Sequence, residues 1–297
     1  MTQFKIAVGI PTVGRPAILA ATLRELSKQT LLPDCVFVCP ATDKDFDLTL
    51  VADLPYPLVV VKGPIGSSAQ RNAIFERARE FDFLVFFDDD FFPSPSYLKE
   101  IALCFANDPT IVVAHGHILA DGAAGPGLDE AEALSILQQS AIRTDQPLTD
   151  DYDAYGCNMA VRLAPVYNHS IRFDENLPLY GWLEDHDFSR RMKPYGRIVK
   201  NNLASGVHLG LKSGSGRTSG VRYGYSQIAN PIYLWRKGIL SLYKALQYSV
   251  PRVVTNLVKI LRPEPWIDRC GRARGHGLAF LDIVRGRLHP TRILEFD

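Results

Sequence analysis

Short apolar segments alternate with segments of helical periodicity along the first 120 residues, and this alternation restricts the fold more than any other feature of the sequence. The apolar segments are rich in β-branched and aromatic residues, which predicts strands at residues 4–10, 35–39, 57–63, 81–87 and 110–118. Apolar residues at helical spacing predict helices at 15–30, 67–80 and 94–108. Strands that alternate with helices predict an α/β fold whose largely parallel sheet is buried on both faces.

Three consecutive carboxylates, Asp88, Asp89 and Asp90, follow the apolar segment 81–87 directly. Ligands of such folds bind at the carboxyl ends of the strands, and this triplet lies at such an end. Asp88 and Asp90 are two residues apart, so they face the same side if the strand geometry continues. A divalent cation with oxygen ligands would offset their repulsion. The alternative is a solvated acidic turn, but the α/β context favours a metal or nucleotide site.

A second acidic cluster, Glu184, Asp185 and Asp187, lies in a segment with helical features. A carboxylate at a helix start is stabilised by the helix dipole, and Asp185 there is a candidate general base. Taken alone, the segment is better explained as an acidic helix start paired with nearby arginines. His208 ends a predicted strand at 204–210 and becomes a candidate metal ligand once an acidic site lies nearby.

Charge is unevenly distributed along the chain. Residues 1–211 hold 18 basic and 27 acidic residues, whereas residues 212–297 hold 15 basic and 5 acidic residues. The basic C-terminal part favours contact with an anionic surface, and a helical cap with solvated charges is the alternative. The five cysteines are scattered without a CxxC pair, which fits a reducing compartment. Neither a signal peptide nor a transmembrane segment is expected.

The order and spacing of these motifs resemble the bacterial family 2 glycosyltransferases, which are inverting enzymes with the GT-A fold. The similar stretches are VGIPTVGRP (8–16), GSSAQRNAI (66–74), LVFFDDDFFPSPSYL (84–98), GCNMAVR (156–162), FDENLPLYGWLEDHDFSRRMKPYG (173–196) and VHL (207–209). The resemblance predicts a GT-A catalytic domain at 1–210, with an insertion at about 120–153. A mobile loop and a helical basic extension are expected at 211–297.

The resemblance also implies roles for individual residues. The residues implied to bind the nucleotide-sugar are Pro11, Thr12, Asp43, Arg71, Asp88, Asp89, Lys212 and Arg217. Asp90 and His208 are implied to bind Mn²⁺ or Mg²⁺, and Asp185 is implied to be the catalytic base. Trp182 and Glu184 are implied to shape the acceptor side.

One position departs from the family pattern. Family members usually carry an acidic residue at the end of the second strand, where it contacts the nucleotide base. This chain has Cys39, Pro40 and Ala41 there, which leaves Asp43 or Asp45 as the substitute. A UDP-linked donor is therefore only the default expectation.

The implied function is the inverting transfer of a sugar from a nucleotide-diphosphate sugar to a hydroxyl of a saccharide or lipid-linked saccharide, in cell-surface polysaccharide synthesis. A cytoplasmic protein is expected, with peripheral contact of residues 231–297 with the inner face of the membrane and with no nucleic-acid partner. One alternative is a sugar-phosphate nucleotidyltransferase, although PTVGRP (11–16) is a poor match to its Gly-rich loop. An aspartyl phosphatase is disfavoured by Phe92, and a non-catalytic nucleotide-sugar binding module is a further alternative.

Overall fold

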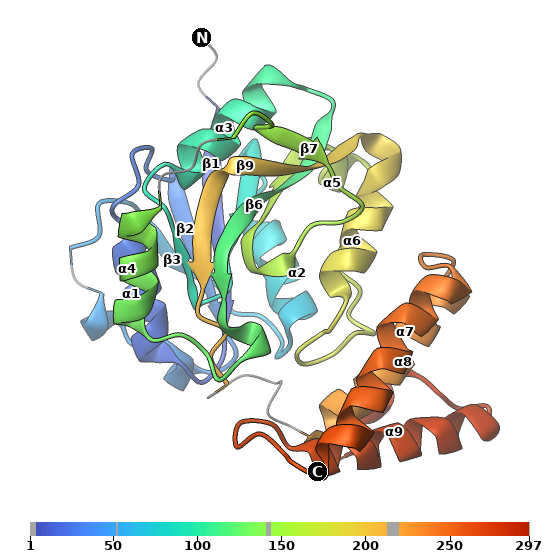
Figure 1. Cartoon of the computed structure of the whole chain (residues 1–297). Coiled ribbons are helices and arrows are strands. Elements are labelled where there is room, and N and C mark those ends of the chain that lie inside the picture. The colour runs from blue at the N-terminus through green and yellow to red at the C-terminus, as the bar shows by residue number, and fades with distance from the viewer. Residues whose placement is uncertain (1–3, 52, 141–143, 213–219, 297) are drawn as a thin grey trace.

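The computed structural model describes residues 4–51, 53–140, 144–212 and 220–296. Its sheet contains the strands β1 (Ile6–Thr12), β2 (Cys35–Pro40), β3 (Leu58–Val60), β4 (Phe83–Phe86), β5 (Phe91–Pro93), β6 (Ile111–Asp121), β7 (Leu148–Asp150), β8 (Met159–Arg162) and β9 (Arg197–His208). The strands are ordered β3-β2-β1-β4-β8-β6-β9-β5, and β7 pairs with β9 (Figure 1).

The sheet confirms the predicted α/β class. β1 runs parallel to β2 and β4, and β2 runs parallel to β3, so the N-terminal part of the sheet is wholly parallel. β8 lies antiparallel between β4 and β6, and the short strands β5 and β7 run antiparallel to β9. These three short strands make the sheet mixed, which the alternation of strands and helices did not predict.

Helices cover both faces of the sheet. They are α1 (Pro16–Leu26), α2 (Ser67–Arg77), α3 (Tyr97–Asn107), α4 (Glu130–Gln139), α5 (Leu163–Asn168) and α6 (Glu184–Met192). One apolar cluster joins α1 and α3 to one face, and a second joins α2 and α6 to the other. Because β4 lies between these two clusters, all four of its side chains are apolar and buried.

Two boundaries differ from the sequence-based expectation. The strand expected at 204–210 begins at Arg197, because β9 pairs in parallel with β6 from Ile111 to Asp121, through three register shifts. The expected insertion at 120–153 contributes α4 and the edge strand β7, which pairs with β9. Part of the insertion is thus built into the sheet.

The helices α7 (Gly220–Arg236), α8 (Leu242–Lys259) and α9 (Arg269–Val284) form a group of their own, coloured orange to red in Figure 1. They share a small apolar core, and α7 crosses α9 closely. A Cβ atom at Gly224 would lie 2.2 Å from the Arg272 carbonyl oxygen, so this crossing requires glycine. Within the described ranges, no helix is long and apolar enough to cross a membrane. Most of the loop expected to be mobile, residues 213–219, lies outside those ranges.

Candidate active site

The three carboxylates lie in the turn that joins β4 to β5. The backbone N–H of Asp88 donates to the Cys157 carbonyl oxygen (3.0 Å), and the N–H of Phe91 donates to the Asp88 carbonyl oxygen (3.1 Å), which closes the turn. Asp88 and Asp90 direct carboxylate oxygens toward His208, whereas Asp89 bonds to Thr12. The two outer carboxylates therefore share one side, although they lie in a turn and not in the continued strand on which that expectation depended.

Asp88, Asp90 and His208 form the cluster most suited to a metal ion. One potential ligand atom from each lies within 4.8 Å of the others. His208 Nε2 lies 3.8 Å from Asp88 Oδ2 and 3.5 Å from Asp90 Oδ1. Its Nδ1 lies 2.9 Å from Asp121 Oδ1. A hydrogen bond from Nδ1–H to Asp121 directs the Nε2 lone pair toward the two aspartates, which is the tautomer that a metal-binding histidine needs.

The donor atoms of this cluster fit a divalent cation such as Mn²⁺. Asp90 Oδ1 is buried without a well-formed hydrogen bond, and His208 Nε2 lies 3.5 Å away, which is an arrangement that suits a cation held between the two groups. Burial would raise the pKa of Asp90, but the proximity of His208 and Arg15 holds it below its usual range. Burial would likewise lower the pKa of His208, but Asp121 and Asp90 raise it to about 9.

Arg15 neutralises the other side of the triplet. Its guanidinium pairs with Asp89, and its Nη1 donates to Asp90 Oδ2 at 2.8 Å. The Thr12 hydroxyl donates to Asp89 Oδ2 at 2.6 Å. The end of β1 and the start of α1 thus hold Asp89 and one oxygen of Asp90, which leaves the second oxygen of Asp90 facing His208.

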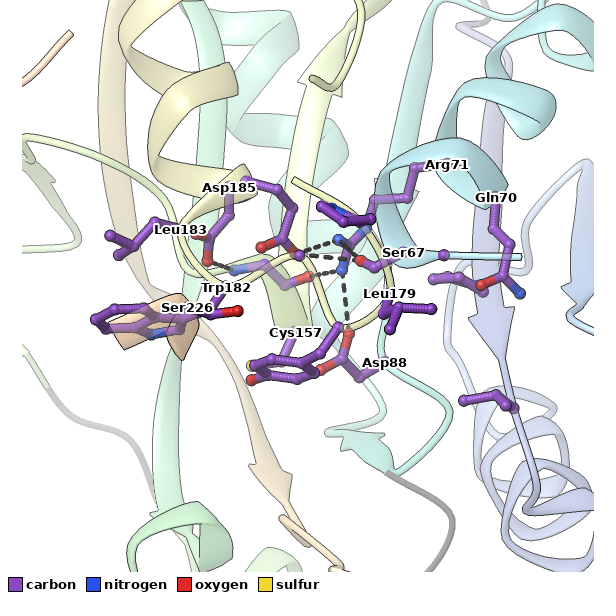
Figure 2. A pocket seen from close by; sticks show the side chains of 18 of the residues that line it. Ser67, Gln70, Arg71, Asp88, Cys157, Leu179, Trp182, Leu183, Asp185 and Ser226 are labelled. Atoms are coloured by element: carbon purple, nitrogen blue, oxygen red, sulfur yellow. Dashed lines mark hydrogen bonds and ion pairs between the residues drawn. The ribbon is translucent and has the colours of Figure 1, made fainter. Parts of the chain in front are cut away.

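Arg71 connects the two acidic clusters. It is fully buried on α2, where its Nη1 donates to Glu184 Oε1 (2.5 Å) and its Nη2 to Asp88 Oδ1 (3.2 Å). Figure 2 shows its guanidinium above Asp88, with dashed lines to both sides of the pocket. Burial raises the pKa of Glu184 to about 7, with Asp185 adding to the shift and Arg71 opposing it. With these contacts Arg71 holds the two acidic sides of the crevice together.

Asp185 lies in the first turn of α6, and two backbone amides orient its carboxylate. The N–H of Gly156 donates to Oδ2, and the N–H of His186 donates to Oδ1, both at 2.7 Å. Leu183, the residue before α6, has φ +74°, an uncommon value for a leucine that marks a backbone held by its surroundings. Burial raises the pKa of Asp185, with Asp153 adding to the shift and the amide bonds opposing it. The carboxylate is therefore a stronger base than a free aspartate.

A pocket of about 720 Å³ connects Asp88 and Asp89 to Glu184 and Asp185, and neither Asp90 nor His208 is among the described residues that line it. Its described lining includes Pro11, Thr12, Arg15, Ala41, Arg71, Asp88, Asp89, Trp182, Glu184 and Asp185. Figure 2 shows Gln70 on one side of this pocket and Asp185 and Trp182 on the other. The Gln70 amide donates to the carbonyl oxygens of Thr12 (3.0 Å) and Cys39 (2.5 Å), which fixes the ends of β1 and β2 together.

The C-terminal helices supply the remaining wall. Tyr223 on α7 and Tyr248 on α8 lie edge-on to Trp182, each with ring centroids 6.1 Å apart. The Arg252 guanidinium lies 4.8 Å from the Trp182 ring centroid. Aromatic faces beside a cation suit a sugar ring with an attached anionic group. His186 also lines this side of the pocket, and Asp153 pairs with its Nδ1.

Three of the expected nucleotide-sugar residues are not among the described residues of this pocket. Asp43 is exposed, and the end of β2 contributes Ala41 instead. Asp45 is buried, but its carboxylate accepts from the backbone N–H of Gly14 (2.7 Å). The Lys212 ammonium donates to backbone carbonyls, among them that of Ala123 (2.7 Å). Arg217 lies outside the described residues.

Several other residues of the site were not assigned a role from the sequence, and they include four charged residues. Arg15 pairs with the acidic triplet, and Asp121 bonds to His208. Asp153 bonds to His186, and the Arg252 guanidinium lies over the Trp182 ring. A sequence signal existed for Arg15 alone, because it follows the first strand in the quoted VGIPTVGRP. Asp121 lies at the end of β6, three residues beyond the predicted strand end.

A comparison with protein-family models decides the family. The model described as glycosyl transferase family 2 matches residues 7–166, which is 160 of the 297 residues. The chain belongs to glycosyl transferase family 2. The matched range contains β1, α2 and the whole acidic triplet, so family membership rests on the segments that form the donor side of the pocket. No curated protein matches the chain in a sequence comparison.

Solved structures support the same fold. A structure of S. aureus TarS 1–349 in complex with UDP-GlcNAc has a TM-score of 0.56 at 18% identity, covering 88% of this chain and 76% of that one. The UDP complex of the same fragment has a TM-score of 0.50 at 20% identity, covering 68% and 59%. GalNAc-T7 with UDP, GalNAc and Mn²⁺ has a TM-score of 0.55 at 12% identity, covering 99% and 56%. This chain therefore spans less than two thirds of the length of the last two structures. All are glycosyltransferase structures, and the likeness confirms the expected GT-A fold.

Proposed function

We propose that this family 2 enzyme transfers a sugar from a UDP-sugar to a saccharide hydroxyl with inversion at the anomeric carbon. The observation that carries the proposal is that one pocket joins Asp88, of the Asp88–Asp90–His208 cluster, to the buried carboxylate of Asp185. An acidic cluster suited to the donor diphosphate and a base suited to the acceptor thus lie on opposite sides of one space. The UDP-containing complexes of TarS and GalNAc-T7 support the choice of UDP.

In this proposal Asp88, Asp90 and His208 hold a divalent cation, with Mn²⁺ favoured over Mg²⁺ because one donor is an imidazole. The bound cation supplies charge stabilisation for the diphosphate as it leaves. Arg15 holds Asp89 and one oxygen of Asp90, and thereby directs the other oxygen of Asp90 toward the diphosphate side. Pro11, Thr12 and Ala41 line the donor half of the pocket.

Asp185 is proposed to take the proton from the acceptor hydroxyl as that oxygen attacks the anomeric carbon. Each carboxylate oxygen accepts one backbone N–H, which fixes its plane and leaves a lone pair for the hydroxyl. The raised pKa strengthens this base. Glu184 pairs with Arg71 and is proposed to position Asp185 without itself moving a proton.

The acceptor is proposed to lie against Trp182, Tyr223 and Tyr248, which are ring-stacking partners suited to a saccharide. A lipid-linked saccharide of cell-surface polysaccharide synthesis is the proposed acceptor class. Residues 231–297 are proposed to contact the inner face of the membrane, and residues 1–210 to form the catalytic domain.

The test is a thermal-shift panel of nucleotide-sugars with and without Mn²⁺, followed by hydrolysis or transfer assays with the donor that binds best. We expect a UDP-sugar to raise the melting temperature and Mn²⁺ to enlarge that shift. Asp185→Asn should bind the donor as the wild type does and lose turnover by at least about 100-fold. Normal turnover in that variant would remove Asp185 as the base. Binding without turnover in the wild type, with every acceptor tried, would favour the non-catalytic binding module.

A further inference from the structure

Helix α8 has its polarity reversed relative to an ordinary surface helix. Its buried residues are Ala245, Ser249 and Asn256, which are small or polar. The Asn256 amide donates to Gln227 Oε1 of α7 (2.9 Å), so the inward face of α8 packs largely through hydrogen bonds and small side chains. In an amphipathic surface helix the large apolar residues normally form the buried stripe.

Most of the large apolar residues of α8 point outward instead. Those on its outer face, together with Leu261 just beyond its end, are each at least 49% exposed: Tyr243, Leu246, Val250, Val254, Leu257, Val258 and Leu261. Spacings of three, four and seven residues place them on one stripe along the whole helix. Among the described residues nothing covers this stripe, and an apolar patch of this length on a monomer marks an interaction surface.

The net charge of the C-terminal segment indicates what covers this stripe. Residues 212–297 hold 15 basic and 5 acidic residues, a net charge of +10. Arg262 follows the end of α8, whereas Arg274 lies on α9 and Arg285 directly after it; all three are exposed, and none forms a salt bridge with a described carboxylate. A second copy of this chain would bring another net positive segment to the same place, which is repulsive. An anionic lipid surface attracts such a segment and accepts an apolar stripe between its headgroups.

We infer that the outer face of α8 lies in the plane of an anionic lipid bilayer, with the apolar stripe between the headgroups and the arginines beside the lipid phosphates. The inference deepens the proposed function and rests on it for the identity of the acceptor. The opposite side of α8 carries Tyr248 and Arg252 into the pocket. One helix thus separates the bilayer from the acceptor wall, which holds the pocket beside a saccharide attached to a lipid.

The test is flotation of the full-length protein with vesicles of pure phosphatidylcholine or of phosphatidylcholine with 30% phosphatidylglycerol. We expect the wild type to float with the anionic vesicles and to lose most of that binding in high salt, because screening weakens the attraction of the arginines. The variant Val250→Glu/Val254→Glu/Leu257→Glu should bind the anionic vesicles at least about tenfold more weakly. All three residues are more than half exposed, so the melting temperature should stay within a few degrees.

The matched control is Leu48→Glu/Leu50→Glu/Leu103→Glu, which adds the same charge at exposed apolar residues of the catalytic domain. It should float as the wild type does. Equal flotation of the α8 variant and the wild type would overturn the inference. The inference would also be overturned if the wild type bound neither kind of vesicle. It would likewise be overturned if the wild type were a dimer in solution and the α8 variant a monomer. UDP-sugar turnover without lipid should be the same in the α8 variant as in the wild type. If the wild type itself shows no turnover, that result counts against the proposed function and not against the membrane contact of α8.

Discussion

Removing the charge of Arg71 should destabilise the protein strongly. Its side chain is 2% exposed, and that of its partner Glu184 is 10% exposed, so solvent screens the pair little. Arg71→Met keeps much of the apolar stem and deletes the guanidinium, which leaves Glu184 with the Ser67 hydroxyl (3.2 Å). Removing one partner of a buried ion pair costs about 3–5 kcal/mol, because the other charge stays buried without compensation.

This loss should depend on pH. Burial already raises the pKa of Glu184 from 4.5 to about 7, so the folded protein binds a proton more readily than the unfolded chain. The contribution of Glu184 to the free energy of unfolding is thus largest below pH 4.5 and falls as the pH rises to about 7. Without Arg71, whose charge opposes the shift, the folded pKa should rise further. The free energy of unfolding of Arg71→Met should then keep falling above pH 7, where Glu184 no longer changes the free energy of unfolding of the wild type.

The assay is urea unfolding followed by tryptophan fluorescence at pH 6 and pH 8.5. Arg77→Met is the matched control, because Arg77 lies on the same helix with an exposed side chain, and it should change the free energy of unfolding by less than about 0.5 kcal/mol. The double variant Arg71→Met/Glu184→Gln should recover part of the loss, since no charge then stays unpaired. A deficit below about 1 kcal/mol at pH 8.5, or a double variant no more stable than the single one, would refute this account.

Three further outcomes are expected. Asp90→Asn should lose the part of UDP affinity that depends on Mn²⁺, measured by calorimetry with and without the ion, and an undiminished Mn²⁺ effect would contradict a metal role. Asp121→Asn should weaken Mn²⁺ binding by about 10–100-fold while His208 remains in place, and unchanged affinity would mean that Asp121 does not orient the imidazole. Burial raises the pKa of Asp185 above the ordinary aspartate value of 3.8. We therefore expect kcat/KM to fall as the pH is lowered, with the midpoint of that fall above pH 3.8. A pH–rate profile that stays flat to pH 4 would speak against an aspartate base.

The parallel half of the sheet was predictable because β1, β2 and β4 are buried on both faces and therefore have continuous apolar sequences. The short strands β5 and β7 were not, since three residues carry no period and their pairing with the distant strand β9 decides their structure. Pairing with β6 likewise extends β9 back to Arg197, through a segment whose mixed polarity gives no strand signal.

The site was predictable where residues cluster along the chain and not where folding alone brings them together. Asp88 and Asp90 could be placed on one side from their spacing. The contacts of Arg15 with Asp89 and of His208 with Asp121 join residues 74 and 87 positions apart, so no local pattern contains them. Asp43 and Lys212 were expected in the pocket by analogy with the family, and local backbone geometry directs them elsewhere.

The cationic partners of the acidic triplet have a consequence for folding. Asp89 and Asp90 lie beside Arg15, Asp88 beside Arg71, and the imidazolium form of His208 adds a further positive charge. The chain therefore carries its own counterions, and its carboxylates can be buried during synthesis before any metal is encountered. Unlike a zinc finger, which unfolds when its metal is chelated, this protein should stay folded in EDTA.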